Sequence, residues 1–346
     1  MSTTENAVEV SHLTRQFTTH IKEPGFSGAL KGLFKRKYQT KIAVSDLNFT
    51  LKKGEFVGFL GPNGAGKTTT LKMLSGVIHP TAGEARVLGF VPSKREAAFQ
   101  KRFSLVLGQK NQLWWDLPAL DSFELNREIY DVPRAIFDAK VAELSALLGL
   151  ETLLRTPVRK LSLGERMKCE LAASLLHSPE VLFLDEPTIG LDLDSQLKIR
   201  EFLRDYNRKT GLTVILTSHY MADIVALCER VVVIAGGQSI FDGPLDDLTA
   251  RYASLRRVRL TLRDEITPAM REIAENLGQG LEIEGTTLKI SVPRDDVPNR
   301  VTQLLAALPV QDLAIEDVEI EAVIRDLFAR GAQNQQKEAR ENAALV

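Results

Sequence analysis

The chain has 346 residues, of which 44% are hydrophobic and 26% are charged, and its formal net charge is −1. This length accommodates one large domain or two ordinary ones, and the composition is that of a globular protein with a sizeable core. The near-zero net charge argues against a basic field over the whole chain, so we expect no nucleic-acid partner. The two cysteines, Cys169 and Cys228, lie in apolar helical patterns and are too few for a disulfide framework, so we expect buried free thiols.

The sequence shows no targeting or membrane-spanning segment. Residues 1–10 are polar and acidic, whereas a signal peptide begins with basic residues and continues with an apolar stretch. Nowhere do about 18 apolar residues follow one another, which is the length that a membrane-spanning helix needs. We therefore expect the chain to act at a membrane only through a partner.

Strands dominate the first part of the chain. Residues 68–78 have the 3.6-residue period of a helix. Residues 18–41 interrupt the strand pattern with a basic insertion, which is either a solvated surface segment or a patch that faces anionic lipid headgroups. Strands are predicted at residues 8–17, 43–52, 55–60, 83–88 and 102–107.

The middle of the chain changes character twice. Residues from about 111 to 160 predict a helical subdomain inserted into an α/β core. Three nearly continuous apolar runs follow, as expected of strands buried on both faces of a parallel sheet, with helices between them. The strands are predicted at residues 181–184, 213–216 and 230–234, and the helices at 122–130, 133–148, 151–155, 165–177, 194–210 and 221–228.

A second domain is predicted beyond a boundary near residue 250. Residues 251–330 have the order β-α-β-β-α-β, which indicates a small α+β domain of the ferredoxin-like type. Its closing helix is expected at residues 318–329, and the polar tail at 331–346 is expected to be disordered. The other elements are predicted as strands at 257–262, 281–283, 287–291 and 312–317, and as helices at 268–276 and 297–307.

A phosphate-binding loop follows the strand at residues 55–60. Gly61, Gly66, Lys67 and Thr68 match the pattern G-x-x-x-x-G-K-[ST] between a strand and a helix. The glycines let consecutive backbone N–H groups face one anion, Lys67 reaches the β- and γ-phosphates, and the Thr68 hydroxyl can bind Mg²⁺. We therefore predict a site for a Mg²⁺-nucleoside triphosphate. Its candidate residues are Gly61, Pro62, Asn63, Gly64, Ala65, Gly66, Lys67, Thr68 and Thr69.

The apolar strand at residues 181–184 ends in two carboxylates, Asp185 and Glu186. Desolvating such a pair is costly, and a Mg²⁺ ion on a phosphate explains it. Asp185 is therefore a candidate metal ligand. Glu186 points elsewhere, because successive strand side chains alternate, and it is placed to act as general base on an attacking water.

Gln109 and His219 also follow predicted strands, and ligands bind at this edge of open α/β sheets. Gln109 can contact Mg²⁺ or its water, and the His219 imidazole can donate to the γ-phosphate. Ser162 and Glu165 form a capping box before the helix at 165–177. The same helix start, with Ser162 and Gly164, could also bind an anion, and the two roles are compatible.

Taken in order, these motifs resemble those of the ATP-binding cassette (ABC) ATPases, over residues 8–243. The resemblance implies a P-loop NTPase cassette in residues 1–250, with a mostly parallel core sheet, an antiparallel β subdomain and the inserted helical subdomain. The matching segments are residues 61–68 (Walker A), Gln109 (Q-loop), 161–165 (signature), 181–186 (Walker B), 189–192 (D-loop) and His219 (switch histidine).

The family pattern implies a head-to-tail homodimer with ATP and Mg²⁺ between the two cassettes. In such a dimer Ser162 and Gly164 contact the partner's nucleotide. An aromatic residue stacks on adenine, and Phe17 fits that place best, with Tyr38 as the alternative. The signature departs from the family at Leu163 and Glu165. The Glu165 carboxylate would slow hydrolysis if it pointed inward, whereas the capping box points it outward.

The segment 110–118 and the C-terminal extension resemble the cassettes of bacterial exporters of the antibiotic and polysaccharide type. The adjacent Trp114 and Trp115 either grip a partner helix or pack inside the helical subdomain. The resemblance implies an ATP-hydrolysing subunit that drives an integral membrane permease on a separate chain. It would sit in the cytoplasm, on the inner face of the plasma membrane. The alternatives are a soluble, non-transport ABC ATPase and a nucleotide-sensing regulatory module.

Overall fold

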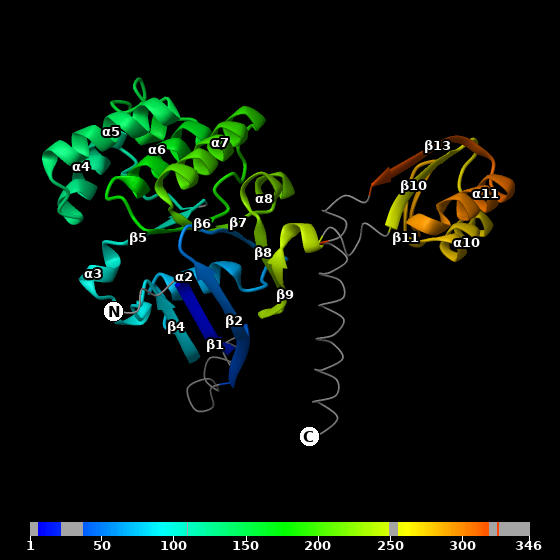
Figure 1. Ribbon diagram of the computed structural model, residues 1–346, viewed down its shortest axis with the longest axis horizontal. Helices are drawn as coiled ribbons and strands as arrows, with labels where there is room; N and C mark the ends of the chain where they lie inside the picture. Colours follow the sequence, from blue (N-terminus) through cyan, green and yellow to red (C-terminus); the bar gives the residue numbers. More distant parts are fainter. Residues whose placement is uncertain (1–5, 22–36, 109, 249–254, 318–323, 325–346) are drawn as a thin grey trace, which may run out of the picture. The chain divides into compact units, whose positions relative to one another are not determined.

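The computed structural model describes residues 6–21, 37–108, 110–248, 255–317 and 324 (Figure 1). Gln109, most of the basic insertion, nearly all of the predicted closing helix at 318–329 and the tail at 331–346 lie outside the described residues. The chain divides into two compact units, Met1–Gly243 and Pro244–Arg330, each of which is described by itself. In the part of the chain that the structure describes, no helix has the length and apolar character needed to cross a bilayer.

The core of the first unit is a six-stranded sheet with the order β5-β6-β7-β3-β8-β9. The strand pairs from β5 to β8 are parallel, so the carboxyl ends of β3, β6 and β7 meet at one edge. β9 is an additional, half-exposed strand at the sheet border that the apolar pattern did not reveal. The strands are β3 (Phe56–Leu60), β5 (Phe103–Leu107), β6 (Val181–Asp185), β7 (Thr213–Thr217), β8 (Arg230–Ala235) and β9 (Gln238–Pro244).

A three-stranded antiparallel sheet, β2-β1-β4, is formed by β1 (Asn6–Ile21), β2 (Lys37–Lys52) and β4 (Ala82–Val87). The prediction that the strand pattern breaks at residue 18 is wrong, because β1 and β2 stay paired as far as Ile21 and Lys37. Thr18 and Thr19 are exposed, so the strands carry no hydrophobic alternation there and the sequence pattern fades before the pairing does.

The helices of the first unit agree with the predicted pattern, with two corrections and one short helix, Ala97–Gln100, that the pattern did not reveal. α2 ends at Leu74 rather than near residue 78, because the chain turns at Gly76, whose φ is 73°. Residues 151–155 form hydrogen-bonded turns instead of a helix. The helices are α2 (Lys67–Leu74), α3 (Ala97–Gln100), α4 (Ala119–Ile129), α5 (Arg134–Leu148), α6 (Leu163–Leu175), α7 (Leu193–Thr210) and α8 (Met221–Leu227), with short 3-10 turns η1 (Pro92–Lys94) and η2 (Val158–Lys160).

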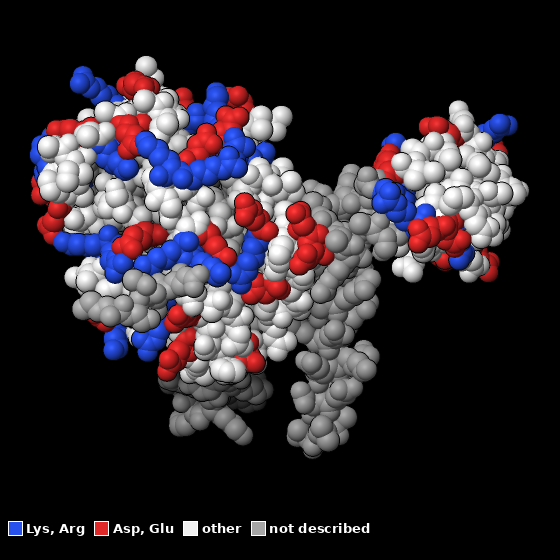
Figure 2. All heavy atoms as spheres, viewed as in Figure 1, with Lys and Arg blue, Asp and Glu red and all other residues white. Residues whose placement is uncertain are grey.

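Helices α4 and α5 pack beside α6, away from the core sheet (Figure 1). Both cysteines are buried and free, as predicted: Cys169 on α6, and Cys228 at the end of α8. Burial raises the pKa of the Cys169 thiol to about 12, and it also raises the pKa of Cys228. Basic and acidic side chains are interspersed over the face shown in Figure 2.

The second unit contains the predicted β-α-β-β-α-β order. Its four-stranded antiparallel sheet has the order β11-β12-β10-β13, so that β12 lies between the two strands that α10 connects, as in a ferredoxin-like domain. Its core includes Val258, Leu260, Leu288, Ile290 and Leu304. The elements are β10 (Leu255–Leu262), α10 (Pro268–Leu277), β11 (Gln279–Glu284), β12 (Thr287–Pro293), η3 (Arg294–Asp296), α11 (Val297–Ala307) and β13 (Val310–Asp317).

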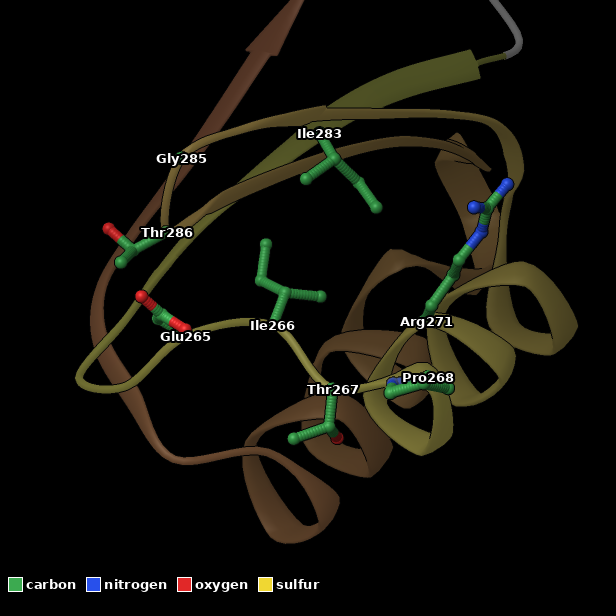
Figure 3. A pocket seen from close by; sticks show the side chains of 8 residues that line it. All are labelled: Glu265, Ile266, Thr267, Pro268, Arg271, Ile283, Gly285 and Thr286. Atoms are coloured by element: carbon green, nitrogen blue, oxygen red, sulfur yellow. The ribbon is translucent and has the colours of Figure 1, made fainter.

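A pocket of about 550 Å³ opens in the second unit between the start of α10 and the β11–β12 hairpin (Figure 3). Ile266 and Ile283 project toward its middle. Thr267 accepts the backbone N–H of Met270, and Arg271 is paired with Glu275 at 2.8 Å. Two polar side chains of this pocket, Thr267 and Arg271, thus already stabilise α10. The residues that the sequence predicts for nucleotide binding lie in the first unit instead.

Candidate functional site

Two glycines shape the loop between β3 and α2. A Cβ atom at Gly61 would lie 2.4 Å from the carbonyl oxygen of Ile234, and one at Gly66 would lie 2.5 Å from that of Ala43. Gly66 also has a φ of 109°, which other residues rarely adopt. A larger residue at either place would displace backbone rather than a side chain. The fold therefore requires glycine at both positions that the phosphate-loop pattern specifies.

Lys67 begins α2 and is only 5% exposed. Its ammonium group donates to the carbonyl oxygens of Gly61 at 2.6 Å and of Pro62 at 3.2 Å. Burial lowers the pKa of Lys67, and the nearby charges of Glu186 and Asp185 partly oppose that effect. A desolvated cation beside a helix N-terminus and a glycine-rich turn is an arrangement that an anion stabilises.

Asp185 ends β6 and receives hydrogen bonds on both carboxylate oxygens. The Thr68 hydroxyl donates to Oδ2 at 2.8 Å, and the Thr217 hydroxyl donates to Oδ1 at 2.7 Å. A hydroxyl and a carboxylate side by side are the oxygen ligands that Mg²⁺ accepts, with its other positions left to phosphate and water. No group of three or more His, Cys, Asp or Glu side chains suited to a metal occurs among the described residues, so a dedicated protein cage is not what this part of the chain provides.

Glu186 and His219 meet just beyond the ends of β6 and β7. Glu186 adopts a left-handed backbone conformation with a φ of 56°, which turns it out of the strand, and its N–H donates to the Thr217 carbonyl at 3.0 Å. Its Oε1 atom lies 2.7 Å from Nε2 of His219. The Glu186 side chain is 15% exposed. The Glu186 carboxylate is thus shielded, whereas the His219 side chain is 37% exposed and leaves the pair open to a small molecule such as water.

Gly108, which precedes Gln109, is held against the backbone of Asp185 and Glu186. The N–H of Gly108 donates to the Asp185 carbonyl at 2.8 Å, and a Cβ at Gly108 would lie 2.1 Å from the carbonyl oxygen of Glu186. Gln109 itself lies outside the described residues. Its neighbour is nevertheless fixed at the edge of the sheet that carries Asp185 and Glu186.

The signature segment forms the predicted capping box at the start of α6. Ser162 accepts the backbone N–H of Glu165 at 3.3 Å, and the Glu165 carboxylate accepts that of Ser162 at 2.8 Å. A Cβ at Gly164 would lie 2.3 Å from Oγ of Ser195 on α7. Ser195 in turn donates to Asp192 from its backbone N–H and from its hydroxyl. Glycine at position 164 therefore lets the signature helix pack closely on the start of α7.

Replacing Glu165 by Gln is expected to leave the turnover of ATP within about threefold of wild type. The amide oxygen can accept the same Ser162 N–H, so the barrier should change by less than about 0.7 kcal/mol. Steady-state phosphate release measures this. Glu165→Ala is the control, because it loses the capping bond and about 1 kcal/mol of stability. A large rise in turnover for Glu165→Gln would show instead that the carboxylate opposes the phosphates.

Phe17 lies on β1, where the guanidinium group of Arg15 stacks over its ring at 4.6 Å from the centroid. One face of the ring is therefore already covered, and the adenine-stacking role remains a prediction. The Tyr38 side chain lies outside the described part of the chain.

Sequence reasoning missed several residues that hold this site. Thr217 binds Asp185, Ser195 packs on Gly164, and Asp223 lies buried behind the loops that carry Glu186 and His219. Asp223 had one recognisable signal, because it interrupts the apolar face made by Met221, Ile224 and Leu227 on α8.

A phosphate loop between β3 and α2, with carboxylates at the end of β6 and a histidine after β7, defines a P-loop ATPase of the cassette type. The model of the ABC transporter family matches residues 44–189, and that of the EvrA-like ABC transporter C-terminal domain matches residues 254–316. The chain belongs to the ABC transporter family as an ATP-binding subunit, and it is an ATPase.

Three relatives illustrate this membership. The linearmycin resistance ATP-binding protein LnrL of Bacillus subtilis is 31% identical over 304 residues, which cover 86% of this chain and 96% of that protein. The ABC transporter ATP-binding protein NatA of the same organism is 34% identical, over 62% of this chain and 87% of NatA. The Nod factor export ATP-binding protein I of Ralstonia nicotianae is 34% identical, over 75% of this chain and 79% of that protein.

Solved structures confirm the fold. A dimeric ATP-binding cassette in a post-hydrolysis state, bound to ADP and Pi, has a TM-score of 0.58 and 23% identity, over 69% of this chain and 98% of that one. A second structure, of an ATP-binding subunit of an ABC transporter, gives a TM-score of 0.59 at 23% identity, over 71% of this chain and 93% of that one.

Proposed function

We propose that the chain hydrolyses MgATP within a homodimer of its own cassette and thereby drives an export permease carried on a separate chain. The observation that supports this best is that the Glu186–His219 pair and the Thr68–Asp185 pair lie together at the carboxyl ends of the core-sheet strands. The first pair offers a proton acceptor and a γ-phosphate contact, and the second offers oxygen ligands for Mg²⁺. The relatives named for resistance and export favour this function over the soluble ATPase and the sensing module.

In this proposal residues 61–69 bind the triphosphate through backbone N–H groups and the Lys67 ammonium. Thr68 and Asp185 hold Mg²⁺ together with Gln109. Bound Mg²⁺ neutralises charge on the β- and γ-phosphates. Phe17 stacks on the adenine.

The reaction needs one proton transfer from water. The water oxygen bonds to the γ-phosphorus while the bond to the β–γ bridging oxygen breaks, and a Glu186 carboxylate oxygen accepts the proton that the water loses. His219 orients Glu186 at 2.7 Å and presents its ring to the γ-phosphate. The products are ADP and inorganic phosphate.

The site proposed here is completed by a second copy of the chain. Ser162 and Gly164 lie at the N-terminus of α6, where the helix dipole and open N–H groups favour an anion. Their contacts are with Glu165 and Ser195, and not with Lys67 or Asp185. We assign them to the partner's ATP, so that nucleotide binding and dimer formation occur together.

Trp114 and Trp115 are 56% and 49% exposed. The alternative in which both pack inside the helical subdomain is therefore wrong. The backbone N–H of Trp114 is fixed by the Ser122 hydroxyl, and the Arg166 guanidinium lies over the Trp115 ring. A large, held aromatic surface suits an interface, so we assign it to the permease, which would keep the chain on the inner face of the membrane.

The double substitution Trp114→Ala and Trp115→Ala is expected to abolish recovery of the permease with the chain from detergent extracts. Each buried interface tryptophan contributes about 2 kcal/mol or more to binding. Binding of ATP should not change. Ile136→Ala, an equally exposed apolar residue on α5, is the matched control and should keep the permease. Failure of the wild-type chain to bring down any integral membrane protein would contradict the proposed partner.

A further inference from the structure

Asp223 is a fully buried carboxylate that the reaction above does not use. It lies on α8 and is 0% exposed. Arg200 on α7 donates from Nε to its Oδ1 atom at 2.5 Å. The hydroxyls of Thr188 and Ser218 both donate to its Oδ2 atom. Burial of a carboxylate is costly unless it is paired and hydrogen-bonded, and here both oxygens are occupied.

The two hydroxyls come from the two loops that carry the proposed catalytic side chains. Thr188 lies two residues after Glu186, and Ser218 immediately precedes His219. Asp223 therefore binds one loop close to Glu186 and the other loop next to His219. The elements involved, β6, β7, α7 and α8, lie together in the first unit (Figure 1).

The sheet does not hold these loops together past its edge. The last residues paired between β6 and β7 are Asp185 and Thr217, and the N–H of Glu186 still bonds to Thr217. Beyond that point the two loops are no longer paired as strands of the sheet. The Asp223 carboxylate lies where the two loops have left the strands, and it accepts one hydrogen bond from each.

A second layer fixes the carboxylate itself. The Nη2 atom of Arg200 donates to the side-chain oxygen of Gln196 at 3.1 Å. The Gln196 amide nitrogen donates to the carbonyl oxygen of Leu191 at 3.1 Å. The Ser218 hydroxyl oxygen also accepts the backbone N–H of Tyr220 at 3.0 Å. Asp223 is thus anchored to α7 and to both loops.

We propose that Asp223 is a positioning residue for ATP hydrolysis: its carboxylate holds the Glu186 loop and the His219 loop at one fixed separation. The inference rests on the proposed roles of those two side chains. Their 2.7 Å contact is short, so a small relative shift of the loops separates them. Misplacement of a catalytic group by about 1 Å costs roughly a hundredfold in rate.

The test cuts the connection to each loop in turn and leaves the buried Asp223–Arg200 pair intact; Ser218→Ala also removes the acceptor of the Tyr220 N–H, whereas Thr188→Val cuts its connection alone. Thr188→Val and Ser218→Ala each remove one hydroxyl, and each is expected to lower kcat between about tenfold and a hundredfold, with the KM for MgATP unchanged. Because either cut frees one loop from the other, the double variant should fall no further than the worse single one. Thr188→Ser restores the hydroxyl and should restore most of the rate.

Ser104→Ala is the matched control. It also removes a buried hydroxyl hydrogen bond, to the Ser174 carbonyl, but it joins no catalytic loop, so its kcat should stay near that of wild type. Stoichiometric ATP binding and thermal melting are recorded for every variant to show that the protein is folded.

Three outcomes would overturn the inference: an unchanged kcat, a double variant as slow as the product of the singles, or a loss that follows the folded fraction. Failure of the proposed function has a different signature, because Glu186→Gln would then keep its turnover. If only the inference fails, Glu186→Gln stays inactive while Thr188→Val remains fast.

Discussion

Replacing Glu186 by Gln is expected to lower steady-state ATP hydrolysis by about 10²–10⁴-fold, which is the usual contribution of a general base. The amide keeps the shape of the carboxylate but cannot take the proton from the attacking water. Binding of ATP uses the phosphate loop and should be preserved. The variant should therefore accumulate as an ATP-bound dimer, which gel filtration in the presence of ATP detects.

Glu180→Gln is the control for this variant. Glu180 lies just before β6, at the end opposite Glu186, and pairs with Arg102 in a partly exposed ion pair. Surface pairs of this kind contribute little, so its turnover should match that of wild type. Equal phosphate release from Glu186→Gln and wild type would remove the role assigned to Glu186.

Replacing Lys67 by Ala is expected to weaken ATP binding by about 10²-fold or more. The ammonium now donates to two loop carbonyls, and phosphate oxygens offer charged acceptors in their place. Hydrogen bonds between charged groups contribute about 1.5–3 kcal/mol each. Burial lowers the pKa of Lys67, and the negative charge of a bound triphosphate should raise it again, because an opposite charge favours the ammonium form. Titration calorimetry with ATP measures the affinity.

Lys72→Ala serves as the comparison for Lys67. It removes the same charge from the last turn of the same helix, α2, and it lies away from the phosphate loop. Its ATP affinity should remain close to that of wild type. Equal losses from both variants would mean that the helix, and not the Lys67 contact, governs binding.

Features that depend on local chemistry were predictable from the sequence. Three features of the site depend on the chemistry of a few neighbouring residues. They are the phosphate loop, the acidic end of β6 and the capping box at Ser162. The buried strands of the parallel sheet were recognisable for the same reason, since a continuous apolar run records burial on both faces. The two-domain order followed from where these patterns change.

Features that depend on distant contacts were not predictable. The paired ends of β1 and β2 have no apolar alternation, since Thr18, Thr19, Gln39 and Thr40 are all exposed, and only their mutual pairing reveals them. The short segment at 151–155 has helical residues but too few to form a helix without neighbours that stabilise it. Thr217, Ser195 and Asp223 act through residues far along the chain, so their roles depend on contacts that only the folded structure brings together.

The buried thiols of Cys169 and Cys228 have a practical consequence. Both are protonated at neutral pH and hidden from solvent, and the sequence contains no other cysteine. The folded chain should therefore ignore maleimide and similar reagents. One cysteine introduced at an exposed place, such as Leu193 at the start of α7, would carry a fluorophore or spin label alone. Opening and closing of the cassettes could then be followed without first removing any native residue.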